Sequence, residues 1–269
     1  MRETEQEHAR PGYRLWRGRR AALALVLLSA FPAVTAAAAA GSERPLLPGV
    51  GPGDRRVPVD AATAPWNGVV RVQTNLAGRC TGALVGPRTV VTAGHCLFNP
   101  RTRRFLAASS LHVLFGYDRG AFSRHVTVAR VATDPAYDPA AVRPDASADW
   151  AVLTLDRPAP DSATALPVAA APLPAGTAVM LGGYSQDRAQ ILMADRDCHV
   201  LGTASGLLVH DCDATRGTSG GPLLVRSGVG WAVAGVGVAA GTVPAVRNFA
   251  VPAARFGAIL ARENAVGQP

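Results

Sequence analysis

The residues with the clearest chemical potential lie in the segment 217–222, GTSGGP, where a serine occupies a turn rich in glycine. Glycine reaches backbone conformations that other residues adopt only with strain. In such a turn the N–H groups of Gly217 and Ser219 can point to the same side as the Ser219 hydroxyl, which is the arrangement of a nucleophile with its own oxyanion hole. Glycine-rich serine turns are common loops, so this pattern needs support from the rest of the chain.

Two titratable side chains stand beside apolar strands upstream of that turn. Residues 90–96, VVTAGHC, run from an apolar strand into a tight turn that presents His95, and residues 147–155, SADWAVLTL, place Asp149 at the head of another strand. Taken singly, a histidine next to a cysteine is usually a packed residue, and an aspartate before a strand is usually a turn former. In the order His95, Asp149, Ser219, the three are candidates for the base, the orienting acid and the nucleophile of an acyl-transfer site.

These local contexts, in this order, resemble those of the chymotrypsin-like (trypsin-fold) serine endopeptidases. The resemblance extends over about residues 66–255, and TAGHC and GTSGGPL are its specific motifs. It implies an enzyme that hydrolyses peptide bonds through an acyl-enzyme, with His95 as general base and then general acid, and Asp149 holding the imidazole tautomer. Asp145 and Asp156 compete for that last role. Asp149 is preferred because it directly precedes the apolar strand, as the family's aspartate does.

The resemblance also assigns the backbone N–H groups of Gly217 and Ser219 to the oxyanion hole, and it makes Gly220 and Gly221 parts of the turn geometry. A catalytically silent homologue that acts as a binding module is the alternative function. The complete triad argues against that alternative, since such homologues commonly lose one member. We expect protein or peptide substrates, no cofactor and no metal.

Three stretches resemble one branch of this family, the bacterial glutamyl-endopeptidase-like group. They are residues 53–59 (GDRRVPV), 80–85 (CTGALV) and 212–217 (CDATRG). Thr218 stands where trypsin carries the acid that pairs with a new N-terminus during zymogen activation. Activation of the trypsin type is therefore not expected in this chain.

The residues that would bind the substrate side chain give conflicting indications. Asp213 lies six residues before Ser219, at the spacing of the acid with which trypsin attracts Arg or Lys, and such a pocket floor would favour a cationic side chain. Glutamyl endopeptidases resemble this stretch too, and their glutamate preference uses a histidine in the strand after the serine, where this chain has Gly237. Gly237 and Val238 are candidate substrate-binding residues, with Val238 and its neighbours pairing with the substrate backbone as an added strand. The residue preference stays open.

The chain has four cysteines, and the N-terminal segment described below predicts export to an oxidising compartment, so we expect two disulfides. The resemblance implies that Cys80 pairs with Cys96, beside the histidine turn. Two strand-like runs joined by GTASG predict an antiparallel hairpin centred on Ser205, which would place Cys198 opposite Cys212.

His199 and His210, next to the second pair of cysteines, suggest a zinc site as the alternative. Because side chains alternate along a strand, His210 shares a face with the two cysteines while His199 points to the other face. Four converging ligands, which a structural zinc site needs, are therefore not available from this hairpin. The disulfide is the preferred prediction.

The first forty residues form a separate segment. Four arginines between positions 14 and 20 precede an apolar run, residues 21–34, and then small residues up to Ala40. This pattern predicts a secretory signal peptide over residues 1–40, cut near Ala40, and hence a secreted or periplasmic protein. An uncleaved membrane anchor is the alternative, since residues 21–40 could just span a bilayer. Residues 41–65, rich in Pro and Gly, are expected to be a pro-segment or an N-terminal arm.

The chain is basic, with a formal net charge of +8 at pH 7, and all 27 basic residues are arginine. A nucleic-acid site would need these residues clustered in one patch. After residue 40 they are scattered, with only short runs such as residues 101–104. We therefore expect no nucleic-acid partner, no membrane contact unless the signal segment is retained, and a monomer.

The elements that must position the catalytic groups are strands. After Trp66, short runs rich in Val and Leu alternate with Gly, Pro, Asn and Asp, which predicts an all-β sandwich or barrel, and one helix is expected over residues 253–263. The resemblance implies two antiparallel six-stranded β-barrels with the active site in the cleft between them. Residues 66–160 would form the first barrel, with the histidine and aspartate of the triad. Residues 161–269 would form the second, with the serine and a short C-terminal helix, and the strand-poor stretch 158–174 is the expected linker.

Overall fold

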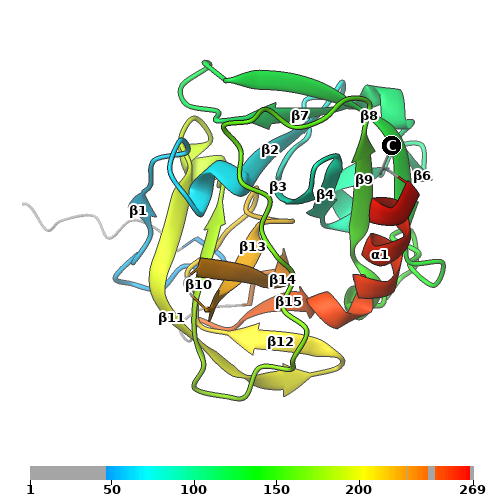
Figure 1. Cartoon of the computed structure of the whole chain (residues 1–269). Coiled ribbons are helices and arrows are strands. Elements are labelled where there is room, and N and C mark those ends of the chain that lie inside the picture. The colour runs from blue at the N-terminus through cyan, green and yellow to red at the C-terminus, as the bar shows by residue number, and fades with distance from the viewer. Residues whose placement is uncertain (1–46, 229, 242–245, 267–269) are drawn as a thin grey trace, which may run out of the picture. The chain divides into compact units, whose positions relative to one another are not determined.

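The structure, a computed structural model, describes residues 47–228, 230–241 and 246–266, all within one compact unit, Arg44–Pro269. Strands dominate the described chain (Figure 1). In chain order they are β1 (Val57–Pro58), β2 (Val69–Thr74), β3 (Arg79–Gly86), β4 (Thr89–Thr92), β5 (Phe98–Asn99), β6 (Arg104–Phe105), β7 (Leu111–Phe115), β8 (Arg124–Thr133), β9 (Ala151–Leu155), β10 (Ala178–Gly183), β11 (Met193–Ala204), β12 (Leu207–His210), β13 (Pro222–Ser227), β14 (Gly230–Ala239) and β15 (Asn248–Pro252). The helices are the short 3₁₀ turns η1 (Trp66–Gly68), η2 (Gly94–Leu97), η3 (Ala108–Ser110), η4 (Ala146–Ala148), η5 (Gln186–Arg188) and η6 (Ala253–Arg255), and the α-helix α1 (Gly257–Val266).

The expected signal peptide, residues 1–40, lies outside the described residues. Among the residues that are described, no helix has the length and apolar character needed to cross a membrane.

The first barrel is closed by β2, β3, β4, β9, β8 and β7 in that order, with antiparallel neighbours throughout. Apolar side chains recur at every second residue of its strands, and the alternate residues Leu111, Val113 and Phe115 of β7 are buried in its interior. β4 and β9 are neighbours, with Thr92 paired to Ala151. The segment that leaves β4 and the segment that enters β9 therefore lie at the same end of the barrel.

The second barrel contains β11, β10, β13, β14, β15 and β12 in sequence, and the pairing of β12 with β11 closes it. The short strand β1 pairs with the beginning of β11, so the N-terminal segment is attached to this barrel. Alternate residues again fill the interior, with Val179 and Leu181 of β10 against Leu223 and Val225 of β13. Two antiparallel six-stranded barrels and a short C-terminal helix confirm the predicted fold class.

The β11–β12 hairpin carries one of the predicted disulfides. Its turn consists of Ser205 and Gly206, at φ 49° and 75°, the pair of positive values that a two-residue hairpin turn of matching twist requires. A register shift near Gly202 separates this turn from the rest of the hairpin. Beyond the shift the strands return to the pairing that the sequence predicts, and Cys198 and Cys212 form a disulfide.

A shared apolar cluster joins the two barrels. Val69 of β2 and Val91 of β4 face outward from the first barrel, and Leu224 of β13 and Val236 of β14 face outward from the second. All four are fully buried. Burial of this apolar surface holds the barrels together and fixes the cleft between them.

Helix α1 links the end of the second barrel to the wall of the first, where it lies beside β9 (Figure 1). The carboxylate of Glu263 accepts hydrogen bonds from Thr154 of β9 at 2.6 Å and from Arg130 of β8 at 2.8 Å. The helix begins at Gly257, after the 3₁₀ turn η6, rather than at residue 253 as the sequence pattern predicted.

Candidate active site

His95 and Asp149 are brought together by the two neighbouring strands that carry them. His95 lies in η2, directly after β4, and Asp149 lies between η4 and β9. One carboxylate oxygen of Asp149 is 2.7 Å from Nδ1 of His95, and the other accepts the backbone N–H of His95 at 2.8 Å. The Asp149 carboxylate is buried, so both contacts are shielded from water. This double contact fixes the orientation of the imidazole ring.

Tyr137 supports the same carboxylate, and the sequence motifs did not point to it. Its side chain is buried and lies close to the Asp149 carboxylate. Burial and the neighbouring negative charge of Asp149 raise the pKa of Tyr137 above its usual value, so its hydroxyl stays protonated. The ring packs over Gly94, where an added Cβ would lie 2.9 Å from a ring carbon.

Ser219 lies in a turn whose geometry depends on glycine. Gly217 and Gly220 have φ values of 91° and 80°, and a Cβ at Gly217 would lie 2.5 Å from a backbone carbonyl oxygen. The N–H groups of Gly220 and Gly221 donate hydrogen bonds of 2.7 Å within the structure. In contrast, the N–H groups of Gly217 and Ser219 donate none to any part of the chain that is described. These two donors are therefore available to an oxygen atom of a ligand.

Thr81, in β3 of the first barrel, fastens this turn. Its N–H donates to the carbonyl of Ser219 at 2.8 Å, and its hydroxyl donates to the carbonyl of Gly217 at 2.9 Å. The hydroxyl also accepts the N–H of Tyr184 at 2.9 Å. Thr81 is fully buried, and its hydroxyl thus both donates and accepts a hydrogen bond there. The sequence placed Thr81 inside a family-like stretch but gave no sign of this role.

Two cavities meet at His95 and Ser219. The β14-side pocket, of about 320 Å³, is lined by Gly237, Val238 and their neighbours in β14. The disulfide-side cavity, of about 660 Å³, is lined by Cys80 and the segment before it. A bound chain could thus run past Ser219 with one half in each cavity.

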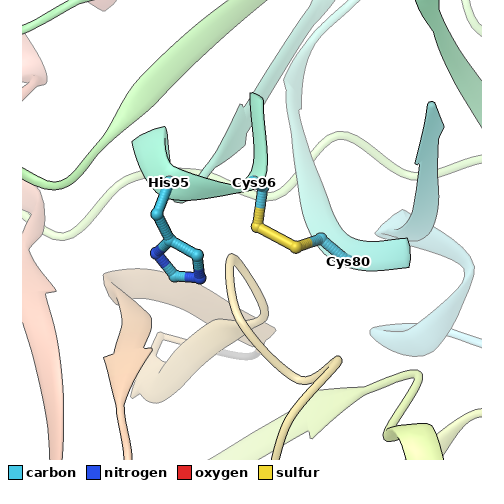
Figure 2. Close-up of side chains that lie close together, drawn as sticks. All are labelled: Cys80, His95 and Cys96. Carbon is cyan, nitrogen blue, oxygen red and sulfur yellow. A yellow bond between two sulfur atoms is a disulfide. The ribbon is translucent and has the colours of Figure 1, made fainter. Parts of the chain in front are cut away.

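Cys80 and Cys96 form a disulfide, as the resemblance implied (Figure 2). Their sulfur atoms and a ring nitrogen of His95 lie within 4.8 Å of one another, a spacing that could suit a metal ion. Because the two sulfurs are bonded to each other, neither is a thiolate ligand. The bridge instead ties the turn that carries His95 to β3.

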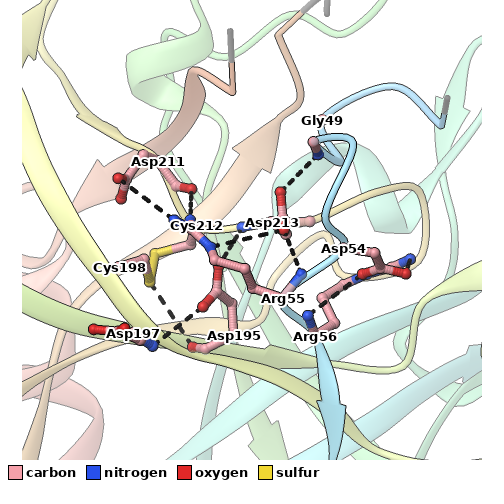
Figure 3. A network of polar contacts seen from close by, with 12 residues as sticks. Gly49, Asp54, Arg55, Arg56, Asp195, Asp197, Cys198, Asp211, Cys212 and Asp213 are labelled. Carbon is pink, nitrogen blue, oxygen red and sulfur yellow. Dashed lines mark hydrogen bonds and ion pairs between the residues drawn. A yellow bond between two sulfur atoms is a disulfide. The ribbon is translucent and has the colours of Figure 1, made fainter. Parts of the chain in front are cut away.

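Asp213 does not line either cavity. Its buried carboxylate accepts the backbone N–H of Gly51 at 2.8 Å. It also accepts the backbone N–H of Arg55 at 2.7 Å (Figure 3). The carboxylate of Asp213 therefore points toward the N-terminal segment and not into the floor of the substrate pocket. Sequence spacing suggested a pocket residue, but the N-terminal segment occupies both carboxylate oxygens.

The segment that engages Asp213, residues 47–59, is the N-terminal arm of the described chain. Arg55 pairs with the buried carboxylate of Asp195 at 3.0 Å (Figure 3). Arg56 pairs with Asp187 at 2.9 Å. Burial opposes the charged form of Asp187, but its hydrogen bond and ion pair with Arg56 outweigh this effect and lower its pKa. The arm is thus held by buried or partly buried ion pairs as well as by β1.

His210 lies in the wall of the β14-side pocket and is fully buried. Neither ring nitrogen has a hydrogen-bond partner among the described residues. Burial lowers the pKa of His210 to about 4, although the charge of Asp211 acts in the opposite direction. The sequence drew attention to His210 only as a possible zinc ligand, and the Cys198–Cys212 disulfide excludes that role.

Two antiparallel six-stranded barrels with a C-terminal helix define the chymotrypsin-like class of proteins. The chain belongs to the trypsin family, whose model matches residues 55–257. A glutamyl endopeptidase of Bacillus licheniformis is 31% identical over 62 residues, which are 23% of this chain and 19% of that relative, so the chain spans about a fifth of its length. A solved structure described as a Glu endopeptidase in complex with MPD superimposes with a TM-score of 0.67 at 21% identity, covering 78% of this chain and 96% of that one. The family resemblance is confirmed, and both relatives belong to the branch that the motifs resemble.

Proposed function

We propose that this protein is a serine endopeptidase in which His95, Asp149 and Ser219 form the catalytic triad. The observation that carries the proposal is the double contact between Asp149 and His95, beside a serine turn with two unused N–H donors. Family membership supports the same reaction class. A catalytically silent binding module would not need an oriented imidazole next to two free donors.

The reaction follows from the positions of these groups. As the oxygen of Ser219 bonds to the substrate carbonyl carbon, its proton passes to Nε2 of His95, and Asp149 stabilises the imidazolium. The carbonyl oxygen, now negative, accepts hydrogen bonds from the N–H groups of Gly217 and Ser219. The carbon–nitrogen bond then breaks as His95 returns the proton to the leaving amine, and water hydrolyses the acyl-enzyme by the reverse use of the same groups.

The acyl half of the substrate would lie along β14, with its side chain in the β14-side pocket. Gly237 has no side chain to block the pocket, and Val238 would pair with the substrate backbone. Among the residues that the structure describes, no aspartate or glutamate lines this pocket, and Asp213 is engaged elsewhere. We therefore do not expect a preference for Arg or Lys at the residue that precedes the cleaved bond.

We also propose that the protein is secreted. The two disulfides fit an oxidising compartment, which agrees with the signal peptide that residues 1–40 predict. The ion pairs of Arg55 and Arg56 with the second barrel support an N-terminal arm that stays with the folded enzyme. Protein or peptide substrates follow from the family.

Hydrolysis of a fluorogenic peptide library tests the function. The wild-type protein should cleave a subset of the peptides, and Ser219→Ala should cleave none. Asp149→Asn should lower kcat by about four decades, the loss expected when the orienting acid of a triad is replaced. Absence of cleavage by the wild type, or full activity in Ser219→Ala, would contradict the proposal.

A further inference from the structure

Three arginines line the disulfide-side cavity, and none of the described residues that line it is acidic. Arg71, Arg79 and Arg216 line it together with His95 and Ser219. Within the described residues none of the three arginines forms an ion pair, whereas Arg55, Arg56 and others on the same molecule do. Three cations of this kind beside one cavity create a positive potential directly next to the nucleophile.

Arg71 is the most unusual of the three because it is buried. Its guanidinium lies 4.0 Å from the centre of the Tyr117 ring and donates one hydrogen bond, to the carbonyl of Ala189 at 2.8 Å. The Nε atom has no partner in the described structure. Burial and the charge of Arg79 lower the pKa of Arg71, against an opposing effect of Tyr117. A buried cation without an anion is costly, and an anionic ligand in the cavity would offset that cost.

Arg79 and Arg216 are exposed, so their side chains are free to reach a bound chain. Arg216 directly precedes Gly217 and lines both cavities, which places it beside the bond to be cleaved. Arg79 begins β3, directly before Cys80 of the disulfide. Guanidinium groups bind carboxylates through paired, charge-assisted hydrogen bonds.

We infer that the disulfide-side cavity is a carboxylate-binding subsite for the leaving half of the substrate. This inference rests on the proposed peptidase function: if the acyl half pairs with β14, the chain beyond the cleaved bond must pass Arg216 and enter this cavity. The carboxylate is either an Asp or Glu side chain within the first residues after the cleaved bond or the free C-terminus of a short peptide. The two sources share the same chemistry and are separated by experiment.

The test uses internally quenched peptides with one constant acyl half, chosen from a sequence that the enzyme cleaves. In the first arm, Asp is compared with Asn at each of the first three positions after the cleaved bond, with the C-terminus amidated. In the second arm, peptides ending two or three residues after that bond carry a free or an amidated C-terminus. We expect kcat/KM to be about tenfold higher for the carboxylate in at least one arm, the size of one charge-assisted contact.

Substitutions of the exposed arginines test whether these side chains cause the preference for a carboxylate. Arg79→Gln and Arg216→Gln should each reduce the ratio of kcat/KM between carboxylate and amide substrates to about twofold or less, and Arg79→Glu should make Lys preferable to Asp. Arg124→Gln, an exposed arginine of β8 that lines neither cavity, removes the same charge and should leave the ratio unchanged. The ratio should also fall as salt screens the exposed cations.

The outcomes are separable. Cleavage with equal kcat/KM for carboxylate and amide substrates in both arms, or a preference that survives both glutamine variants, overturns the subsite while leaving the peptidase function intact. Absence of cleavage of every peptide overturns the peptidase function and the subsite with it. A preference in the first arm alone identifies an acidic side chain, and one in the second arm alone identifies a free C-terminus.

Discussion

The hydroxyl of Thr81, in the first barrel, donates a 2.9 Å hydrogen bond to the carbonyl oxygen of Gly217, in the serine turn of the second barrel. The N–H of Thr81 donates to the carbonyl of Ser219 in the same turn. The barrel that carries His95 thus also holds the peptide units next to the two N–H groups that we propose as oxyanion donors. In the proposed site, alignment of nucleophile, base and oxyanion hole depends on this contact between barrels.

Thr81→Val preserves the shape of the side chain and removes its hydroxyl. The carbonyl of Gly217 and the N–H of Tyr184 would lose their partner, which should lower the free energy of unfolding by about 2 kcal/mol and lower kcat as the oxyanion donors lose alignment. Chemical denaturation and peptide hydrolysis measure the two effects. Thr81→Ser, which keeps the hydroxyl, should restore most of both. Equal loss in the valine and serine variants would argue against the hydrogen bond as the cause.

Tyr137→Phe removes a buried hydroxyl that lies close to the Asp149 carboxylate. We expect kcat to fall about fivefold to tenfold, because a polar group beside the carboxylate that orients His95 is lost. Peptide hydrolysis by the purified variant measures this effect. An unchanged kcat would show that Tyr137 only packs against Gly94.

Asp213→Asn tests whether this aspartate binds substrate or the N-terminal arm. Loss of the negative charge weakens the contacts with the Gly51 and Arg55 N–H groups and with the Arg55 guanidinium. The free energy of unfolding should fall by about 2–4 kcal/mol, as expected when one partner of a buried charged network is removed. The preference for the residue before the cleaved bond should stay the same. If the variant instead lost a preference for Arg or Lys and kept the stability of the wild type, the result would indicate that Asp213 binds the substrate side chain.

We expect the buried His210 to make the free energy of unfolding depend on pH. Its pKa is about 4 in the folded chain, against 6.5 for an unperturbed histidine. Above pH 6.5 the ring is neutral in both states and has no effect. As the pH falls from 6.5 to 4 the unfolded chain takes up a proton that the folded chain does not, so stability decreases by about 3 kcal/mol over this range and changes no further below it.

The matched variant is His210→Met, which stays neutral and apolar. Urea unfolding between pH 7 and pH 4 should show a smaller loss of stability in this variant than in the wild type, by about 3 kcal/mol. Identical pH dependence in the two proteins would mean that the buried imidazole does not control acid stability.

The short motifs predicted much of the structure because they act locally. The contact between His95 and Asp149 needs only that each residue adjoin one of two neighbouring strands, and the alternating apolar residues specify those strands. The serine turn is likewise encoded by the glycines within it. The hairpin disulfide follows from chain spacing and a two-residue turn.

The failures share one physical cause, which is contact between distant parts of the chain. The partners of Asp213 lie 162 and 158 positions earlier, in an arm whose composition suggested only a pro-segment or an extension. The role of Tyr137 depends on a loop that folds back over Gly94. No local pattern in the sequence reveals that His210 borders a cavity or that Arg71 is buried beside one.

The central claim is that His95 activates Ser219, and covalent labelling tests it most directly. The purified protein is treated with a fluorophosphonate under native conditions, and the modified residue is located by peptide mass spectrometry. One adduct on Ser219 is predicted in the wild type, with none in His95→Ala over the same time. Absence of the adduct from the native wild type, an adduct on another serine, or equal labelling of His95→Ala would contradict the account.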